Sequence, residues 1–480
     1  MIAAHATLAA VTDPSGPPAG TESFDAAEIA RLAGGRLVHD ADRPIRGAAV
    51  DSRRIVPGNL FVALPGERTD GHEHLAEAVA NGAAAVLVSR PGLPAEGLGS
   101  VSVIRVGRPL DALGAIAAGW RARFEPLTVG ITGSIAKTST KEAVADVLAV
   151  RFRTLRSEGN ENNEIGLPLT VLRLERADQA LVLEMGMYVG GEIADLARIA
   201  RPQVGVVTAV QPVHLSRIGT IEAIEQAKGE LVEALPASGT AILNADDERV
   251  ARMAARTAAR VLTYGFGPGA EVTADSIQSA GADGMRFTLR TAAGRQPVAL
   301  PGLGRHAVHN ALAAAAVGSV AGLELDEIAE GLAVPPPAAH RGDLIRLGDV
   351  TILDDSYNAA PASVRAALAV LAGLPGRRVA VLGEMLELGD GHEAGHLDVG
   401  RRAAQVAELL VVVGAGAEPI GRGAREAGMA TGRVIEVADR QAALEALLPR
   451  LAPGDVILVK ASRGIALDRL IDELRIELEP

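Results

Sequence analysis

Short apolar runs alternate with helical patterns along most of this chain, and that alternation restricts its fold more than any other feature. The clearest runs are only three or four residues long, which is typical of buried strands rather than helices. Strands that alternate with helices indicate parallel sheets with helices on both faces, so an α/β fold is predicted. The clearest predicted strands are Leu181–Leu183, Val204–Val207, Ala241–Leu243, Thr351–Leu353, Val379–Leu382, Leu410–Val413 and Val456–Val459.

Length and composition exclude several classes of protein. A chain of 480 residues is too long for a single core. The formal net charge of -12 argues against nonspecific nucleic-acid binding, because neutralising phosphates requires clustered Lys and Arg. The absence of cysteine excludes disulfides and thiolate metal ligands. Because the longest apolar run, 311–323, is too short to span a bilayer and no signal peptide is evident, we expect a soluble, cytoplasmic protein without membrane insertion. We also expect a monomer.

Shifts in composition divide the chain into a lead and three predicted domains. Residues 1–22 are rich in Pro and Gly near their end and are expected to form a flexible lead. Residues 23–108 contain short strands around one helix and form the first predicted domain. The alternating pattern then continues through 109–335 and 336–480, and a stiff proline run at 335–337 marks the boundary between these two domains.

A glycine-containing loop joins a predicted strand at 127–129 to a predicted helix at 137–150 and indicates phosphate binding. Backbone N–H groups and the positive helix end meet there, which favours an anion. Lys137 would reach the outer phosphates, and Thr138 would offer its hydroxyl to Mg²⁺. Alanine replaces an expected glycine, so by itself the segment fits either an ATP loop or an ordinary strand–turn–helix junction. The predicted nucleotide-binding residues of the loop are Gly130, Gly133, Ser134, Ala136, Lys137, Thr138 and Ser139.

Reactive side chains follow several of the predicted strands. The carboxyl ends of parallel strands meet at one edge of a sheet, where ligands of α/β proteins bind. Because reactive side chains recur at this end of several strands, we predict that they share one cleft rather than lie separately on the surface. They are Lys137, Thr138, Glu184, His214, Asp354, Asp355 and Lys460.

Lys228 lies on the apolar stripe that Ile221, Ile224, Leu231 and Leu235 define in a predicted helix from Thr220 to Leu235. One interpretation is a lysine whose ammonium extends to the edge of the core. The other is a desolvated amine with a lowered pKa. Such an amine can capture CO₂ as a carbamate, which would form a Mg²⁺ site with Glu184 and His214.

The segment His392–His396 satisfies the H-E-x-x-H pattern of zinc proteases literally. Three glycines at 389, 391 and 395 weaken the helix that such a site requires. We therefore expect no zinc site here.

An ordered series of motifs resembles the Mur ligases, the family that builds the peptide of bacterial cell-wall precursors. The likeness begins near Phe24 and covers nearly all of the remaining chain. Within the family, Asp354–Ala359 and Lys460–Arg463 look like the members that add D-alanyl-D-alanine. The other motifs are Asp51–Arg53, Pro57–Ala63, Gly66–His72, Thr132–Ser134 with Lys137–Thr138, Asn160–Gly166, Glu184–Gly186, Gln226–Glu230 and Asn244–Asp246.

The resemblance implies a UDP-sugar-binding domain, a central ATP-binding domain and a C-terminal Rossmann-like domain. It also implies ATP-dependent ligation of D-alanyl-D-alanine to UDP-N-acetylmuramoyl-tripeptide through an acyl phosphate. Lys137, Lys228, His214 and Glu184 would be catalytic. Thr138 and Glu184 would hold one Mg²⁺, and carbamylated Lys228 and His214 would hold a second. ATP would also meet Asn163, Asn310, Arg341 and Asp355, and the substrates would meet Ser52, Arg53, Asn358, Lys460, Ser462 and Arg463.

Some positions depart from the family pattern. Ala136, Ala307 and Ala461 replace usual Gly, Asn and Gly residues, and Gln211–His214 replaces a Gly-Pro-x-His run. Two alternatives therefore remain beside the leading interpretation. One is a non-catalytic homologue that only binds UDP-sugar or nucleotide, and the other is a related ligase with a different amino substrate.

Overall fold

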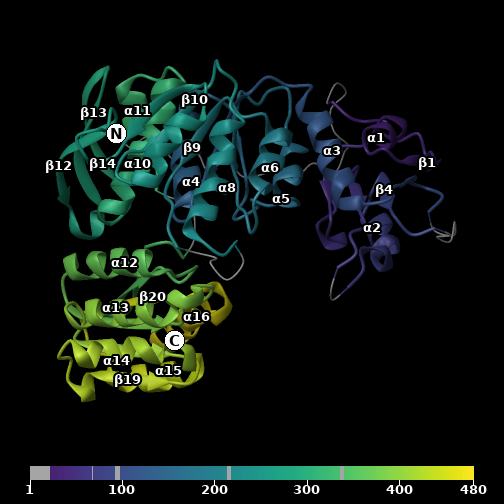
Figure 1. Ribbon diagram of the computed structural model, residues 1–480. Helices are drawn as coiled ribbons and strands as arrows, with labels where there is room; N and C mark the ends of the chain where they lie inside the picture. The colour runs from purple at the N-terminus through teal and green to yellow at the C-terminus, as the bar shows by residue number, and fades with distance from the viewer. Residues whose placement is uncertain (1–21, 67–68, 92–97, 213–217, 336–339, 480) are drawn as a thin grey trace, which may run out of the picture. The chain divides into compact units, whose positions relative to one another are not determined.

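The computed structural model describes residues 22–66, 69–91, 98–212, 218–335 and 340–479 (Figure 1). The chain divides into two compact units. The first contains the chain up to Ile116 together with Glu175–Ala177, and the second contains Ala117–Leu174 and the chain from Asp178 onward. The α/β class expected from the alternation is confirmed by mainly parallel sheets in both units. The finer division at 108/109 and 335/336 stays a prediction.

The first unit is built on a five-stranded sheet with the order β1-β5-β4-β3-β2. Its strands are parallel except for β1, which pairs with β5 in the antiparallel sense. All four residues of β4 are buried, as expected for a central strand covered on both faces. The elements are α1 Ala26–Leu32, β1 Arg36–His39, β2 Ala48–Ala49, β3 Leu60–Val62, α2 Leu75–Ala80, β4 Ala85–Val88 and β5 Ser102–Arg105.

The second unit contains a six-stranded parallel sheet with the order β11-β10-β9-β6-β8-β7 (Figure 1). Helices α4 and α10 pack together on it, and α6 and α8 form another packed pair. Each apolar run predicted here is a strand, and β8, β9 and β10 are buried throughout. Helix α3, Pro109–Arg121, begins in the first unit and ends in the second. The other elements are β6 Leu127–Thr132, α4 Lys137–Ala149, β7 Thr154–Arg156, α5 Gly166–Val171, β8 Ala180–Glu184, α6 Glu192–Ala200, β9 Val204–Val207, α8 Ile221–Glu233, β10 Thr240–Asn244, α9 Glu248–Arg252, β11 Arg260–Tyr264, α10 Gly304–Val320 and α11 Leu325–Leu332.

A three-stranded antiparallel sheet, absent from the sequence prediction, precedes α10. It consists of β12 Thr273–Ser279, β13 Met285–Thr291 and β14 Gly294–Leu300. In β13, the buried side chains Met285, Phe287 and Leu289 alternate with more exposed residues. This two-residue period indicates a sheet with one buried face, whereas the continuous apolar runs used for the prediction detect only strands buried on both faces.

The C-terminal part of the second unit contains another six-stranded sheet, ordered β15-β16-β20-β17-β18-β19. Only β15 is antiparallel to its neighbour. Helices α12, α13 and α14 contribute to one hydrophobic cluster on this sheet, and α15 and α16 contribute to another. The elements are β15 Asp343–Leu347, β16 Val350–Asp354, α12 Pro361–Gly373, β17 Arg377–Gly383, α13 His392–Ala404, β18 Leu409–Val413, α14 Glu418–Glu426, β19 Val434–Val437, α15 Arg440–Leu447, β20 Asp455–Lys460 and α16 Asp468–Leu478.

Candidate active site

The loop between β6 and α4 has the geometry of a phosphate-binding turn despite its alanine. Ala136 immediately precedes α4 and adopts φ 65° and ψ 2°, a left-handed conformation that costs an L-residue about 1–2 kcal/mol. Gly133 has φ 151°, and a Cβ atom there would lie 1.8 Å from Thr208 Oγ1. The loop therefore requires glycine at 133, whereas at 136 it accommodates a methyl group at the expense of backbone strain.

Lys137, the first residue of α4, folds back over this loop. Its Nζ donates hydrogen bonds to the carbonyl oxygens of Gly133 at 2.8 Å and Ser134 at 3.4 Å. Burial lowers the pKa of Lys137, and the nearby carboxylate of Glu184 opposes that shift. The amine is thus held at the N-terminus of a helix, where anions bind.

Glu184 ends β8 and lies beside the first turn of α4. Its side chain is buried, and each carboxylate oxygen has a different partner. Thr138 Oγ1 donates to Glu184 Oε2 at 2.8 Å, and Asn162 Nδ2 donates to Oε1 at 2.7 Å. Thr138 and Glu184, which the sequence predicted to lie in one cleft, are therefore in direct contact. Asn162 holds the other carboxylate oxygen of Glu184.

This donor set fits one of the two proposed Mg²⁺ sites. A hydroxyl and a carboxylate are hard oxygen donors, and protein-bound Mg²⁺ commonly uses one or two carboxylates together with phosphate oxygens and water. Within the described ranges, no group of three or more His, Asp or Glu side chains is arranged to hold a metal. His214, predicted as a ligand of the second ion, lies outside the described residues.

Lys228 of α8 is only 3% exposed, so its ammonium does not extend into solvent in the way the first interpretation required. Burial lowers its pKa well below the ordinary lysine value, and the positive charge of Lys137 lowers it further. No described residue accepts a hydrogen bond from Lys228 Nζ. Of the two interpretations drawn from the sequence, burial favours the desolvated amine with a lowered pKa.

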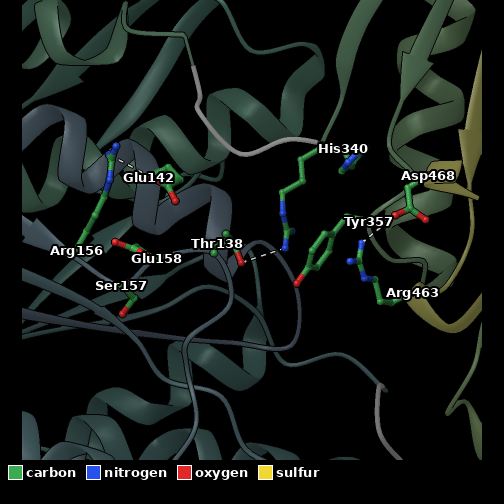
Figure 2. A pocket seen from close by; sticks show the side chains of 11 residues that line it. Thr138, Glu142, Arg156, Ser157, Glu158, His340, Tyr357, Arg463 and Asp468 are labelled. Carbon is green, nitrogen blue, oxygen red and sulfur yellow. Dashed lines mark hydrogen bonds and ion pairs between the residues drawn. The ribbon is translucent and has the colours of Figure 1, made fainter. Parts of the chain in front are cut away.

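Residues from the C-terminal part of the second unit reach Thr138 (Figure 2). Arg341 donates from NH2 to Thr138 Oγ1 at 3.1 Å, and its guanidinium carbon lies 4.0 Å from the centre of the Tyr357 ring. Thr138, Arg341 and Tyr357 all line one cavity of about 430 Å³. It is lined by Thr138, Glu142, Arg156, Ser157, Glu158, Gly159, His340, Arg341, Tyr357, Arg463 and Asp468.

A second group of predicted residues gathers where β16 and β20 end. Lys460 Nζ lies 2.6 Å from Asp355 Oδ2 and donates to the carbonyl oxygen of Asn358 at 2.8 Å. Ser462 is also buried, and its Oγ accepts a hydrogen bond from the backbone N–H of Leu386 at 2.9 Å. The structure thus brings Asp355, Asn358 and Lys460 into direct contact, while their predicted ligands stay predictions.

The remaining predicted residues have separate surroundings. Asn163 Oδ1 accepts from the backbone N–H of Gly166 at 2.9 Å at the start of α5, and Asn310 Oδ1 lies 3.5 Å from Thr140 Oγ1. In the first unit, Ser52 Oγ donates to Glu77 at 2.6 Å. The exposed Arg53 hydrogen-bonds Asp51 and lowers the pKa of that carboxyl to about 2.

The histidines of the H-E-x-x-H segment have structural partners. His396 is completely buried, and its Nε2 accepts from the backbone N–H of Met385 at 2.9 Å. Its Nδ1 lies 2.6 Å from the carbonyl oxygen of His392. Because both ring nitrogens are engaged, His396 anchors the loop after β17 and has no nitrogen free to ligate zinc.

Sequence reasoning missed three residues of this region. Asn162 was within a recognised motif but had no role, although it holds Glu184. Tyr357 stacks against Arg341. Lys141 is completely buried on α4, and its spacing from Val144, Ala145 and Leu148 would have identified it by the criterion applied to Lys228.

Comparisons with known proteins identify the family of this chain. Sequence profiles of the Mur ligase family match residues 44–121 (Mur ligase family, catalytic domain), 131–318 (Mur ligase middle domain) and 340–463 (Mur ligase, glutamate ligase domain). The UDP-N-acetylmuramoyl-tripeptide–D-alanyl-D-alanine ligase of Mycobacterium tuberculosis is 41% identical, over 93% of this chain and 97% of its own. This chain belongs to the Mur ligase family.

Solved structures extend the likeness of this Mur ligase to three dimensions. MurF from Acinetobacter baumannii matches with a TM-score of 0.86 and 30% identity, over 95% of this chain and 99% of its own. MurF from Thermotoga maritima, solved in complex with ADP, matches with a TM-score of 0.79 and 28% identity, over 90% and 98% of the two chains. The three-domain architecture expected for a Mur ligase is thereby confirmed. None of the helices in the described ranges is long and apolar enough to cross a membrane.

Proposed function

We propose that this Mur ligase uses ATP to join D-alanyl-D-alanine to UDP-N-acetylmuramoyl-tripeptide. A carboxylate oxygen of the tripeptide attacks the γ-phosphorus, and ADP leaves. The amine of the dipeptide then attacks the carbonyl carbon of the acyl phosphate, giving an amide, inorganic phosphate and a proton. What carries the proposal is the convergence of Lys137, Thr138, Glu184 and Arg341 at the end of β6, in a chain matched over nearly its full length by D-alanyl-D-alanine-adding ligases.

The residues at the end of β6 divide the work of phosphoryl transfer. The backbone N–H groups of the loop and of the first turn of α4 cradle the phosphates. Lys137 and Arg341 supply positive charge where two anions must approach each other, which is the main demand of this chemistry. Thr138 and Glu184 would hold Mg²⁺, which when bound neutralises charge on the phosphates.

Lys228 would act as a carbamate in this proposal. Its neutral amine adds to CO₂ and releases a proton, giving an N-bound carboxylate that can serve as an oxygen ligand. The amine fits this reaction because burial lowers its pKa and no described residue occupies its Nζ. Together with His214 it would complete the second Mg²⁺ site.

The remaining roles follow from position and likeness. Asn163 lines the phosphate cleft, while Asn310 and Asp355 meet the adenine and ribose. Ser52 and Arg53 belong to the UDP end, and Asn358, Lys460, Ser462 and Arg463 face the dipeptide and acyl group. We propose that the enzyme works as a cytoplasmic monomer, where ATP and the nucleotide-linked precursor are available.

Phosphate release tests the proposal directly. Purified enzyme is incubated with UDP-N-acetylmuramoyl-tripeptide, ATP, Mg²⁺ and D-alanyl-D-alanine, and each substrate is omitted in turn. We expect phosphate and the pentapeptide product only in the complete mixture. Release with single amino acids but not the dipeptide would indicate a related ligase, and no release above an enzyme-free control would indicate a non-catalytic binding protein.

A further inference from the structure

Lys141 is a completely buried cation that none of the roles above uses. Its Nζ donates to the carbonyl oxygens of Ser157 at 2.6 Å and Gly159 at 3.1 Å, and it lies 2.6 Å from Glu142 Oε1. An ammonium group has three protons, and each has one oxygen partner here. Two of those partners belong to the segment that follows β7, so Lys141 ties this segment to α4.

The segment held by Lys141, residues 157–162, contacts Glu184 at both of its ends. At one end, Ser157 Oγ accepts from the backbone N–H of Glu184 at 3.3 Å. At the other, Asn162 Nδ2 donates to Glu184 Oε1 at 2.7 Å, and the Asn162 carbonyl accepts from Gly186 N–H at 2.8 Å. Lys141 binds the carbonyl groups of Ser157, which is itself the first contact, and of Gly159, which lies between the two contacts in sequence.

The consequence concerns the orientation of one carboxylate. Asn162 engages Oε1 of Glu184, so Oε2 is the oxygen presented to Thr138. Without the Asn162 contact, the buried carboxylate could rotate and turn its oxygens away from Thr138. Partners that orient a metal-ligating side chain typically affect metal affinity or activity by about 10–100-fold.

We propose that Lys141 is a positioning residue for the nucleotide–metal site. It fixes residues 157–162 by their carbonyl groups, Asn162 thereby fixes Glu184, and Glu184 meets the metal with one defined oxygen. The proposal rests on the proposed function only in that Glu184 and Thr138 bind a metal with the nucleotide. Lys141 itself touches neither substrate nor metal.

A buried cation elsewhere in the same unit provides a matched control. Arg121 is 3% exposed and donates to the carbonyl oxygens of Ala200 at 2.9 Å and Phe124 at 2.6 Å. It also donates to Thr128 Oγ1 at 2.9 Å, near the start of β6, whereas the phosphate loop follows the end of that strand. Removing Arg121 therefore removes a buried, carbonyl-bound cation without touching the segment 157–162.

The test compares Lys141→Met with Arg121→Met by a readout independent of ligation. Mn²⁺ binding in the presence of ADP is measured by electron paramagnetic resonance on the folded fraction of each protein. We expect about 10–100-fold weaker Mn²⁺ binding in Lys141→Met and wild-type binding in Arg121→Met. Absence of Mn²⁺–ADP binding in the wild type would contradict the proposed metal site, and with it this inference. Wild-type binding without ligation would contradict only the proposed function.

Asn162→Ala keeps the inference testable even if Lys141→Met does not fold. We expect Asn162→Ala to weaken Mn²⁺ binding to a similar degree, and the double variant to be little weaker than either single one, because both act through Glu184. Wild-type Mn²⁺ binding in Lys141→Met or in Asn162→Ala would overturn the inference. Equal weakening in Lys141→Met and Arg121→Met would also overturn it, because the effect would then be general destabilisation.

Discussion

Lys141 and Lys228 are two buried lysines that each lie on the apolar face of a helix, but their described surroundings differ. Each lies on an apolar stripe, Lys141 with Val144, Ala145 and Leu148 on α4 and Lys228 with Ile224 and Leu231 on α8. Lys141 has three oxygen partners, whereas no described residue accepts a hydrogen bond from Lys228. Burial alone is therefore no guide to the role of a lysine here.

The difference has a physical basis. A buried charge is tolerated where its protons are paired, so Lys141 is suited to hold structure as a cation. Lys228 faces the positive charge of Lys137 and has no compensating anion among the described residues, so its pKa falls. A neutral amine can react, and a fully hydrogen-bonded ammonium cannot. The comparison predicts that substitutions of the two lysines have different effects on turnover, on the free energy of unfolding and on its pH dependence.

The largest expected effect is on turnover. Lys228→Met removes the amine that would become a metal-ligating carbamate, so we expect kcat/KM for phosphate release to fall by at least about 10²–10³-fold. Arg121→Met, assayed in parallel, should keep near-wild-type activity. Short carboxylic acids are expected to restore part of the activity of Lys228→Ala. Wild-type turnover in Lys228→Met would remove Lys228 from the catalytic group.

Stability should change in the opposite direction for the two lysines. Lys141→Met leaves two backbone carbonyls without their donor and leaves Glu142 with Arg156 as its remaining cationic partner, and removing one partner of a buried ion pair costs about 3–5 kcal/mol. Lys228→Met replaces an amine that has no described partner by an apolar chain of similar size, so the free energy of unfolding should be unchanged or increased. Urea unfolding of both variants without added metal measures this. Equal losses would show that the two environments are energetically alike.

The pH dependence of stability should also distinguish Lys228. Its pKa is lowered on folding, so between that lowered value and about 10.4 the unfolded chain binds a proton that the folded protein does not. Wild-type stability relative to Lys228→Met should therefore rise with pH across this interval, by at most about 1.4 kcal/mol per pH unit. Unfolding titrations of both proteins between neutral pH and pH 10 measure the slope. A difference that does not change with pH would mean that the amine is charged in the folded protein.

The smallest expected effect is at Ala136, in the loop before α4. Ala136→Gly relieves the positive φ of 65° but adds the conformational freedom of glycine to the unfolded chain. We expect stability to increase by no more than about 1 kcal/mol and kcat/KM to stay within about tenfold of wild type. Thermal unfolding and phosphate release test both. A larger gain in activity would show that the methyl group impairs the phosphate site.

Much of the fold and part of the site could be predicted from the sequence. Continuous apolar runs identified strands such as Leu181–Leu183 and Val456–Val459, because central parallel strands are buried on both faces. The antiparallel sheet of β12, β13 and β14 was missed because its signal is alternation within a half-polar segment. Thr138 and Glu184 were predicted to meet because both follow neighbouring strands of one parallel sheet.

The sequence determined the α/β class, the order of the strands along the chain and the likeness to Mur ligases, since these depend on local periodicity and on ordered motifs. Only the tertiary structure decided which lysine has oxygen partners among the described residues. Lys141 and Lys228 both have apolar neighbours at helical spacing, but the carbonyl groups that pair Lys141 belong to residues 16 and 18 positions away. Helical periodicity predicts that a side chain is buried; the packed fold decides which atoms surround its charge.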